Sequence, residues 1–190
     1  MISRFRFSSL LPEPAVRPYL GYLAALFAAG ILAGILSPPP FRRRIAEGFL
    51  EMMEPLQNRA GGELFLLILV NNTIETLFMV LFGVLFGILP VLSVATNGFL
   101  LGVLYLQSAA AVGYWKAALQ VMPHGVFEIP AFLFAASYGM WLGVSFLHRV
   151  RRREADPLGM KVLHAVRKYF AVAFPMFVIA AAVETASIVF

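Results

Sequence analysis

The chain has 190 residues, of which 61% are hydrophobic and only 13% are charged. Soluble domains carry about 25% charged residues, so this composition excludes an ordinary soluble globular domain. There is no cysteine, which excludes disulfides, thiolate metal sites and cysteine nucleophiles. The formal charge of +5 comes from basic residues beside apolar runs, a pattern that indicates membrane topology and not nucleic-acid binding.

The apolar runs predict an all-α fold, a polytopic transmembrane helical bundle in a single domain covering residues 1–190. Lipid offers no partner to backbone polar groups, and the runs lack the alternation of barrel strands, so helices are expected. About five spans result. They lie at roughly 18–37, 64–88, 91–112, 123–147 and 169–190.

The first span should be a retained helix and not a cleaved signal, because further spans follow it. It ends at a run of three prolines, residues 38–40, which cannot continue a helix. The segment 41–59 places its apolar residues near one helical face, and we expect a short amphipathic helix at the membrane surface. Those apolar residues are Ile45, Phe49, Met52, Met53 and Leu56.

Within residues 64–112 the only charged residue is Glu75. A straight helix of this length would reach roughly 70 Å, so the chain must fold back at least once. Gly87 and Pro90 weaken the helix, and we expect the turn near them. A short amphipathic linker then leads to Pro123, which suits the first turn of the next helix.

The basic segment 148–168 sets the expected orientation in the membrane. Its seven Lys and Arg residues predict a cytoplasmic loop. Five spans then place the N-terminus in the cytoplasm and the C-terminus outside. The first loop would be external in spite of the three arginines at 42–44.

Ionisable side chains inside the predicted spans are the most informative feature of the sequence. Glu75, Glu128 and Glu184 each lie in a span, where a charge costs roughly 2.5–3.5 kcal/mol on insertion scales. Asparagine and histidine side chains lie near them, some at helical spacing. The candidate polar site inside the membrane consists of Asn71, Asn72, Glu75, Asn97, His124, Glu128 and Glu184.

Three interpretations of these residues are open. They can form interhelical hydrogen bonds that only fix packing. They can line a proton or cation pathway, helped by carbonyls that Pro130 and Pro175 leave without a donor. They can also form a catalytic centre, although His124 and Glu128 are spaced HxxxE and not HExxH, and two ligands are too few for catalytic zinc. We therefore expect no enzyme, no metal and no cofactor.

Four pairs of glycines at GxxxG spacing fall in separate predicted spans, at Gly30/Gly34, Gly83/Gly87, Gly98/Gly102 and Gly139/Gly143. Such pairs let helix backbones approach closely. They predict tight helix packing, above all at Gly83, Gly87, Gly98, Gly102, Gly139 and Gly143. They also favour a homodimer or another homo-oligomer.

Three stretches resemble a known family: NNTIETLFMVLFGVLFGILP, TNGFLLGVLY and PHGVFEIPAFLFAASYGMWLG. They are similar to the stage II sporulation protein M family of bacterial and archaeal membrane proteins, over roughly residues 64–190. The most distinctive element, PHGxxExPA, is formed by Pro123, His124, Gly125, Glu128, Pro130 and Ala131. An asparagine, an NG dipeptide and a late acidic residue of the family resemble Asn71 or Asn72, Asn97 with Gly98, and Glu184.

The resemblance implies a membrane role without a defined chemistry. The named member of the family acts in engulfment during endospore formation, as the membrane partner of a peptidoglycan-degrading complex. Two hypotheses follow here: a channel or transporter-like oligomer with a buried Glu/His/Asn site, or a non-catalytic scaffold that recruits cell-envelope remodelling proteins. Expected partners are the lipid bilayer, further copies of the chain and other membrane or envelope proteins.

Overall fold

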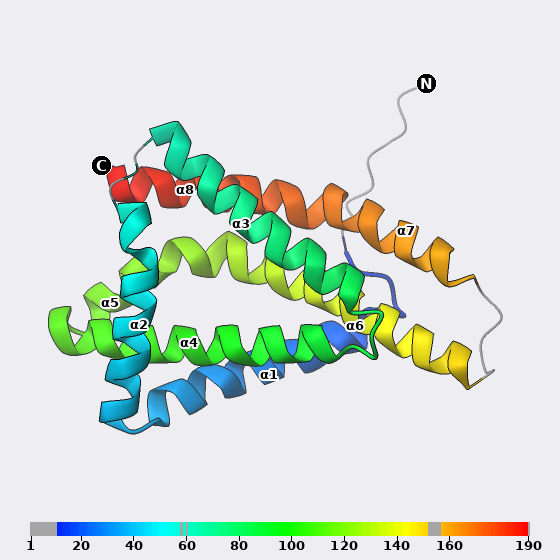
Figure 1. The fold of residues 1–190 in the computed structure, drawn as a ribbon, viewed down its shortest axis with the longest axis horizontal. Helices are drawn as coiled ribbons and strands as arrows, with labels where there is room; N and C mark the ends of the chain where they lie inside the picture. Colours follow the sequence, from blue (N-terminus) through cyan, green and yellow to red (C-terminus); the bar gives the residue numbers. More distant parts are fainter. Residues whose placement is uncertain (1–10, 58, 60, 152–156, 190) are drawn as a thin grey trace.

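The computed structural model describes residues 11–57, 59, 61–151 and 157–189, and the side chains of 53–57, 120, 122–124 and 187–189 lie outside that description. The described residues form helices and connecting turns, without a β-strand, which confirms the predicted all-α fold (Figure 1). The α-helices are α1 (Arg17–Leu36), α2 (Pro39–Gln57), α3 (Gly61–Phe82), α4 (Ile88–Val112), α5 (Tyr114–Pro123), α6 (Ile129–Val150), α7 (Leu158–Lys168) and α8 (Phe174–Val189). Two π-helical turns, η2 (His124–Glu128) and η3 (Tyr169–Ala173), join α5 to α6 and α7 to α8.

Five segments of the described chain are long and apolar enough to cross a membrane. Each has 20 or more residues, and at about 1.5 Å per residue this matches a hydrocarbon core of about 30 Å. The chain is therefore a membrane protein with five candidate spans, as the sequence predicts. They are Arg17–Leu36, Gly61–Phe82, Ile88–Val112, Gly125–Val150 and Leu158–Ala186.

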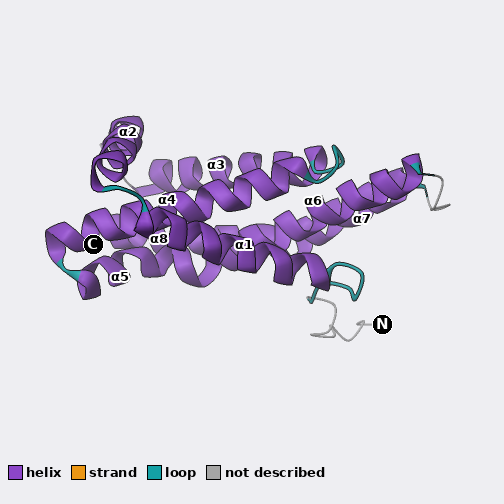
Figure 2. Ribbon diagram, turned by 90° about the horizontal axis from the view of Figure 1, so that it is seen from below, coloured by secondary structure: helices purple, strands orange, loops and turns teal. Residues whose placement is uncertain are grey.

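Successive spans alternate in direction, as Figures 1 and 2 show. α1, α4 and the α7–α8 segment run from the end of the bundle where α1 begins, called the N-terminal end below, to the end where α8 finishes, called the C-terminal end, and α3 and α6 run back. The turn between α3 and α4 lies at the N-terminal end, and α2 lies at the C-terminal end. α6 is the central helix, because it packs on α1, α3, α4 and α7 and belongs to the most buried of the five spans.

A glycine seam joins α1 to α4, which run in the same direction. A side chain at Gly30 would put its Cβ 2.8 Å from the carbonyl oxygen of Ala95. Gly34 likewise lies against the backbone of α4, while Gly98 and Gly102 lie against the backbone of α1. Four glycines from two helices therefore interlock within one chain, and any larger residue would force the helices apart.

A second glycine seam joins α3 and its following turn to α6. A Cβ at Gly83 would lie 2.5 Å from the carbonyl oxygen of Gly139, and Gly143 lies against the backbone of Gly87. Gly87 has a φ of 71° and Phe86 a φ of 60°, so this turn needs the left-handed conformation that glycine adopts freely. With both seams filled, all four glycine pairs pack inside the monomer.

The basic segment 148–168 is a helical hairpin over most of its length and not the expected loop. α6 continues to Val150 and α7 already begins at Leu158, so the hairpin extends beyond the turn between α3 and α4 (Figure 1). Lys161, His164 and Lys168 recur at helical spacing on α7, which places them on one face. A count of charges alone hides this periodicity.

Two prolines inside spans directly follow the π-helical turns. Pro130 lies in the first turn of α6, after η2, and Pro175 lies in the first turn of α8, after η3. Backbone N–H groups in the first turn of a helix make no intrahelical hydrogen bond, so proline, which has no N–H, fits there. The π-helical turn before each proline changes the hydrogen-bonding pattern of the backbone at that point. Pro123, expected to begin a span, instead ends α5 in a helix that continues through η2.

The amphipathic helix α2 crosses the C-terminal end of the bundle, transverse to the spans (Figure 1). The Arg42 guanidinium donates to the carbonyl of Ile35 at 3.2 Å and also to the carbonyl of Ser37. The Ser37 hydroxyl donates to the carbonyl of Gly34 at 2.7 Å. These bonds satisfy carbonyls that the end of α1 leaves free. Arg42, one of the three arginines at 42–44, therefore has a structural role at the end of α1.

Candidate functional site

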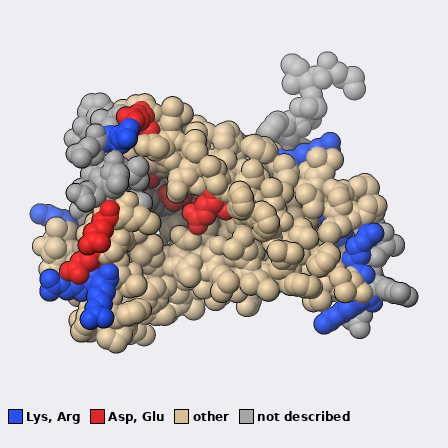
Figure 3. Space-filling model, in the orientation of Figure 1, with Lys and Arg blue, Asp and Glu red and all other residues tan. Residues whose placement is uncertain are grey.

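The central polar contact of the membrane region lies between α3 and α4. The amide nitrogen of Asn97 donates to a carboxylate oxygen of Glu75 at 3.1 Å and to the carbonyl of Ser93 at 3.0 Å. We call Glu75 and Asn97 the Glu75 pair. Glu75 is exposed on the outside of the bundle and Asn97 is half-buried. Figure 3 shows acidic side chains in the middle of this face, beside a hollow.

Asn71 and Asn72 lie about one helical turn before Glu75. The Asn71 amide nitrogen is 3.5 Å from the side-chain oxygen of Asn72, which is at the outer limit of a hydrogen bond. Asn71 is exposed and Asn72 is half-buried. Asn71 therefore shares the outer face of α3 with Glu75, while Asn72 turns partly inward.

A buried hydrogen bond joins the inner face of α3 to the last span. The hydroxyls of Thr76 and Tyr169 are 2.8 Å apart, and both side chains are buried. The Tyr169 hydroxyl also donates to the carbonyl of Thr73 at 3.3 Å. Local pattern does not indicate this role for Tyr169, because the residue lies 93 positions from Thr76 and directly follows a basic segment.

Glu128 and Glu184 lie on η2 and α8, two segments that pack together. Both carboxylates are half-buried, and each has an interaction partner. Both lie closer to the C-terminal end of the bundle than Glu75 does, because Glu128 begins its span and Glu184 ends its own. The side chain of His124 lies outside the described residues. Among the residues with a described placement, no three His, Asp or Glu side chains are arranged to hold a metal.

The two faces of α3 are packed very differently. α3 rests on α6 and α8 and makes only a minor contact with α4, which leaves the hollow between α3 and α4 seen in Figure 3. On its inner face, Met79 and Val80 are fully buried and Gly83 enters the seam with α6. The polar residues therefore lie on the side of α3 that is loosely covered, and the apolar core closes the other side.

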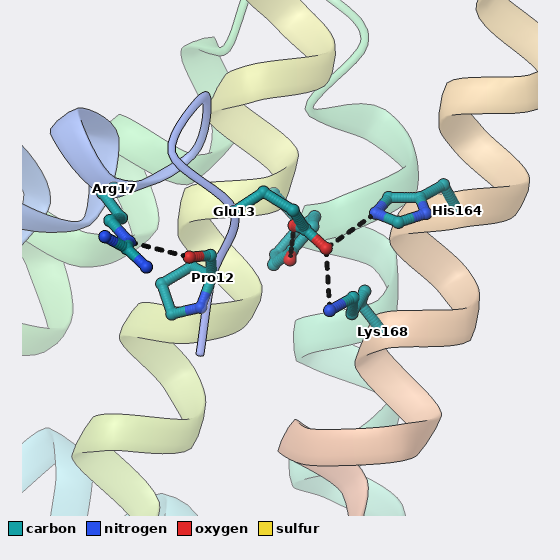
Figure 4. Close-up of polar contacts among 6 residues, drawn as sticks. Pro12, Glu13, Arg17, His164 and Lys168 are labelled. Atoms are coloured by element: carbon teal, nitrogen blue, oxygen red, sulfur yellow. Dashed lines mark hydrogen bonds and ion pairs between the residues drawn. The ribbon is translucent and has the colours of Figure 1, made fainter. Parts of the chain in front are cut away.

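A second polar cluster, which the sequence did not indicate, lies near the N-terminal end. Lys168 donates to a carboxylate oxygen of Glu13 at 2.7 Å, and His164 lies 3.1 Å from the same oxygen. Tyr138 donates to the other oxygen. Figure 4 shows how Glu13 reaches the two side chains of α7 from the segment that precedes α1. We call these four residues the Glu13 cluster.

The Glu13 carboxylate is charged over the physiological pH range. Burial alone raises its pKa, but hydrogen bonds from Lys168 and Tyr138 outweigh burial and lower the pKa from 4.5 to about 2. The cluster fixes the segment before α1 to α6 and α7, and it satisfies a lysine whose side chain is only 18% exposed. His164 and Glu13 are 151 residues apart, and Lys168 is farther still, so no motif or periodicity joins them in the sequence.

The polar face of α7 continues toward the tip of the hairpin. Lys161 donates to the Ser145 hydroxyl at 3.2 Å, and its ammonium lies 5.4 Å from the centre of the Trp141 ring, within range of a cation–π contact. Met160 and Leu163 of α7 are exposed. The hairpin thus directs Lys161 toward α6 and presents a mixed outer surface, on which Arg167 is exposed beside Met160 and Leu163.

Comparison with known proteins identifies the family. The sequence model of stage II sporulation protein M matches residues 23–186, a range that contains the Glu75 pair and both glycine seams but not Glu13. No curated protein and no solved structure matches the chain at a significant level. Because the match extends over most of the described spans, the chain belongs to the stage II sporulation protein M family.

Proposed function

We propose that the protein is a channel or transporter for protons or small cations, with the Glu75 pair at its centre and without catalytic activity. The observation that supports this is a carboxylate exposed inside a span and held by an amide of the neighbouring helix. Ionisable side chains within membrane spans are costly and commonly mark ion or proton pathways. A carboxylate binds a cation or accepts a proton, and Asn97 holds its orientation.

The neighbouring residues fit a path that enters from the C-terminal end. Glu128 and Glu184 lie nearer that end, so a cation or proton would meet them before the Glu75 pair. Beyond Glu75 the seam between Gly83 and Gly139 holds α3 against α6 at backbone contact, so the path would continue on the loosely covered side of α3, toward α4. The π-helical turns η2 and η3 provide places where the surrounding spans can bend.

Flux measurements in proteoliposomes test this proposal. The wild type should carry protons or a monovalent cation down an imposed gradient, and Glu75→Gln should abolish the flux because the amide neither ionises nor attracts a cation. Glu128→Gln should reduce it. The matched control is Glu47→Gln, since Glu47 is an exposed carboxylate on α2 that pairs with Arg43 at 2.7 Å. Equal flux through wild type and Glu75→Gln, or none through either, contradicts the proposal.

A scaffold is the second candidate function, and the α6–α7 hairpin favours it. The hairpin extends beyond the α3–α4 turn (Figure 1) and exposes Arg151, Arg167, Met160 and Leu163. Such a mixed surface suits docking of a cell-envelope protein. Met160→Cys should then crosslink to one discrete partner in native membranes, and Arg151→Glu with Arg167→Glu should remove that product. A hairpin that crosslinks to nothing while the protein conducts excludes the scaffold.

The proposed orientation places the N-terminus and the hairpin in the cytoplasm and the C-terminus outside. The hairpin carries a high density of Lys and Arg, which favours the cytoplasmic side. Because the chain has no cysteine, a single cysteine at Met160 or at Tyr114 reports its own side. In intact cells an impermeant maleimide should label Tyr114→Cys and not Met160→Cys, and the reverse pattern refutes the orientation.

A further inference from the structure

The outer face of α3 is an apolar stripe interrupted by two polar side chains. Exposed apolar residues recur along it at helical spacing, and Ile74 and Phe78 are each 55% exposed. Asn71 and Glu75 lie within the same stripe and are also exposed. The other members are Leu67, Val70, Leu81 and Phe82.

Lipid is a poor environment for this stripe. In the described part of the chain, the carboxylate of Glu75 has one hydrogen-bond partner, Asn97. The amide of Asn71 makes only the long contact of 3.5 Å with Asn72. Hydrogen-bonding groups left facing hydrocarbon cost free energy, so a protein surface that offers donors and acceptors at this depth is favoured over lipid.

The glycine pairs cannot provide a contact between copies, because both seams are filled within the monomer. The stripe on α3 that contains Asn71 and Glu75 is an exposed face within a span, and it carries a donor and an acceptor side by side. Asn71 offers N–H donors and Glu75 offers carboxylate acceptors, one helical turn apart on the same helix. A surface that carries both groups is complementary to itself, which is the requirement of a two-fold interface.

We propose that a second copy of the chain covers this face, with α3 packed against α3 of its partner about a two-fold axis along the membrane normal. The axis brings α3 of both copies together at equal depth, and because Asn71 and Glu75 lie only one helical turn apart, the side chain of Asn71 in each copy reaches along the interface to donate to Glu75 of the other. The stripe of Ile74, Phe78 and their apolar neighbours packs around these bonds. The hollow beside the Glu75 pair then lies between two subunits and is shielded from lipid.

Crosslinking of single-cysteine variants in native membranes tests this interface, and the absence of natural cysteine makes the readout clean. Ile74→Cys should form a product of twice the chain mass with a short bis-maleimide. Leu32→Cys on α1, which is 58% exposed, is the matched control and should remain monomeric. Equal crosslinking at both positions, no crosslinking at Ile74→Cys, or a product of another mass overturns the proposal.

A second comparison asks whether the polar residues hold the contact. Adding Asn71→Leu and Glu75→Leu to Ile74→Cys keeps the stripe apolar and the chain insertable, and it should weaken dimerisation roughly five- to thirtyfold, the effect of interhelical bonds worth about 1–2 kcal/mol. Unchanged crosslinking in this variant overturns the role of Asn71 and Glu75 in the contact. Crosslinking is measured without any ion flux. Failure of the dimer proposal can therefore be told apart from failure of the transport proposal.

Discussion

The Glu13 cluster and the Glu75 pair are two solutions to the same problem, a carboxylate in a mostly apolar molecule. Glu13 lies near the N-terminal end and is bound by a lysine, a tyrosine and a histidine. Glu75 lies within a span, faces outward and is bound by one asparagine. The first carboxylate is saturated with partners and serves the fold. The second retains capacity for another partner, which is what a site for an ion, a proton or a second subunit requires.

Removal of Glu13 should have the largest effect on stability. Glu13→Leu removes the carboxylate that binds the partly buried Lys168, and we expect a loss of about 2 kcal/mol. Thermal unfolding in detergent measures it as a lower Tm. Glu47→Leu is the control, because its partner Arg43 is exposed and surface pairs contribute little. A Tm unchanged by Glu13→Leu contradicts the structural role of the cluster.

Acidification should remove the same contribution. The pKa of Glu13 is lowered in the folded state from 4.5 to about 2, so its stabilisation is fully present above about pH 4.5 and is lost as the pH falls toward about 2. The free energy of unfolding, measured against pH, should therefore decline less steeply in Glu13→Gln than in the wild type. Parallel curves for the two proteins contradict the assignment.

The Thr76–Tyr169 bond should have an intermediate effect. Tyr169→Phe removes one buried hydroxyl and should cost about 1 kcal/mol, while the Thr76 hydroxyl keeps its bond to the carbonyl of Asn72. Tyr114→Phe, at a position 68% exposed, provides the control for loss of a phenol hydroxyl. If both variants unfold at the wild-type temperature, the buried bond does not hold α3 to the last span.

Glu75→Gln should have the smallest effect on stability. The glutamine carbonyl still accepts from Asn97, and the neutral side chain is easier to place in lipid, so Tm should stay close to that of the wild type. A large loss of stability would show that Glu75 serves the fold in the same way as Glu13. That result would support the interpretation in which the polar residues of the spans form interhelical hydrogen bonds that only fix packing.

The amino-acid sequence predicts those parts of the molecule that depend on local pattern. The five spans follow from apolar length, and the glycine pairs follow from four-residue spacing. The carboxylates of the polar site were also visible, because a charge inside an apolar run is a local anomaly. The pairing of Gly83 with Gly139 was not visible, since spacing shows that a helix has a small-residue face but not which helix fills it.

The features that sequence reasoning missed depend on contacts between distant segments. Tyr138 meets Glu13 across 125 residues, and neither residue stands out in its own surroundings. The hairpin at 148–168 is hidden for another reason, because the number of its charges indicates a loop and only their helical spacing indicates α7. The outward direction of Glu75 also needed the structure, since helical position alone does not show which face meets the bundle.

Ion flux through Glu75→Gln and Glu13→Leu, compared in proteoliposomes with matched amounts of inserted protein, separates the role of the Glu75 pair from that of the Glu13 cluster. If the Glu75 pair is the functional site, Glu75→Gln should be as stable as the wild type and carry no flux, whereas Glu13→Leu should be less stable but conduct at the working temperature. Flux that persists in Glu75→Gln would contradict the claim that the Glu75 pair is the functional site. So would flux that is lost in Glu13→Leu in proportion to its loss of stability while Glu75→Gln still conducts.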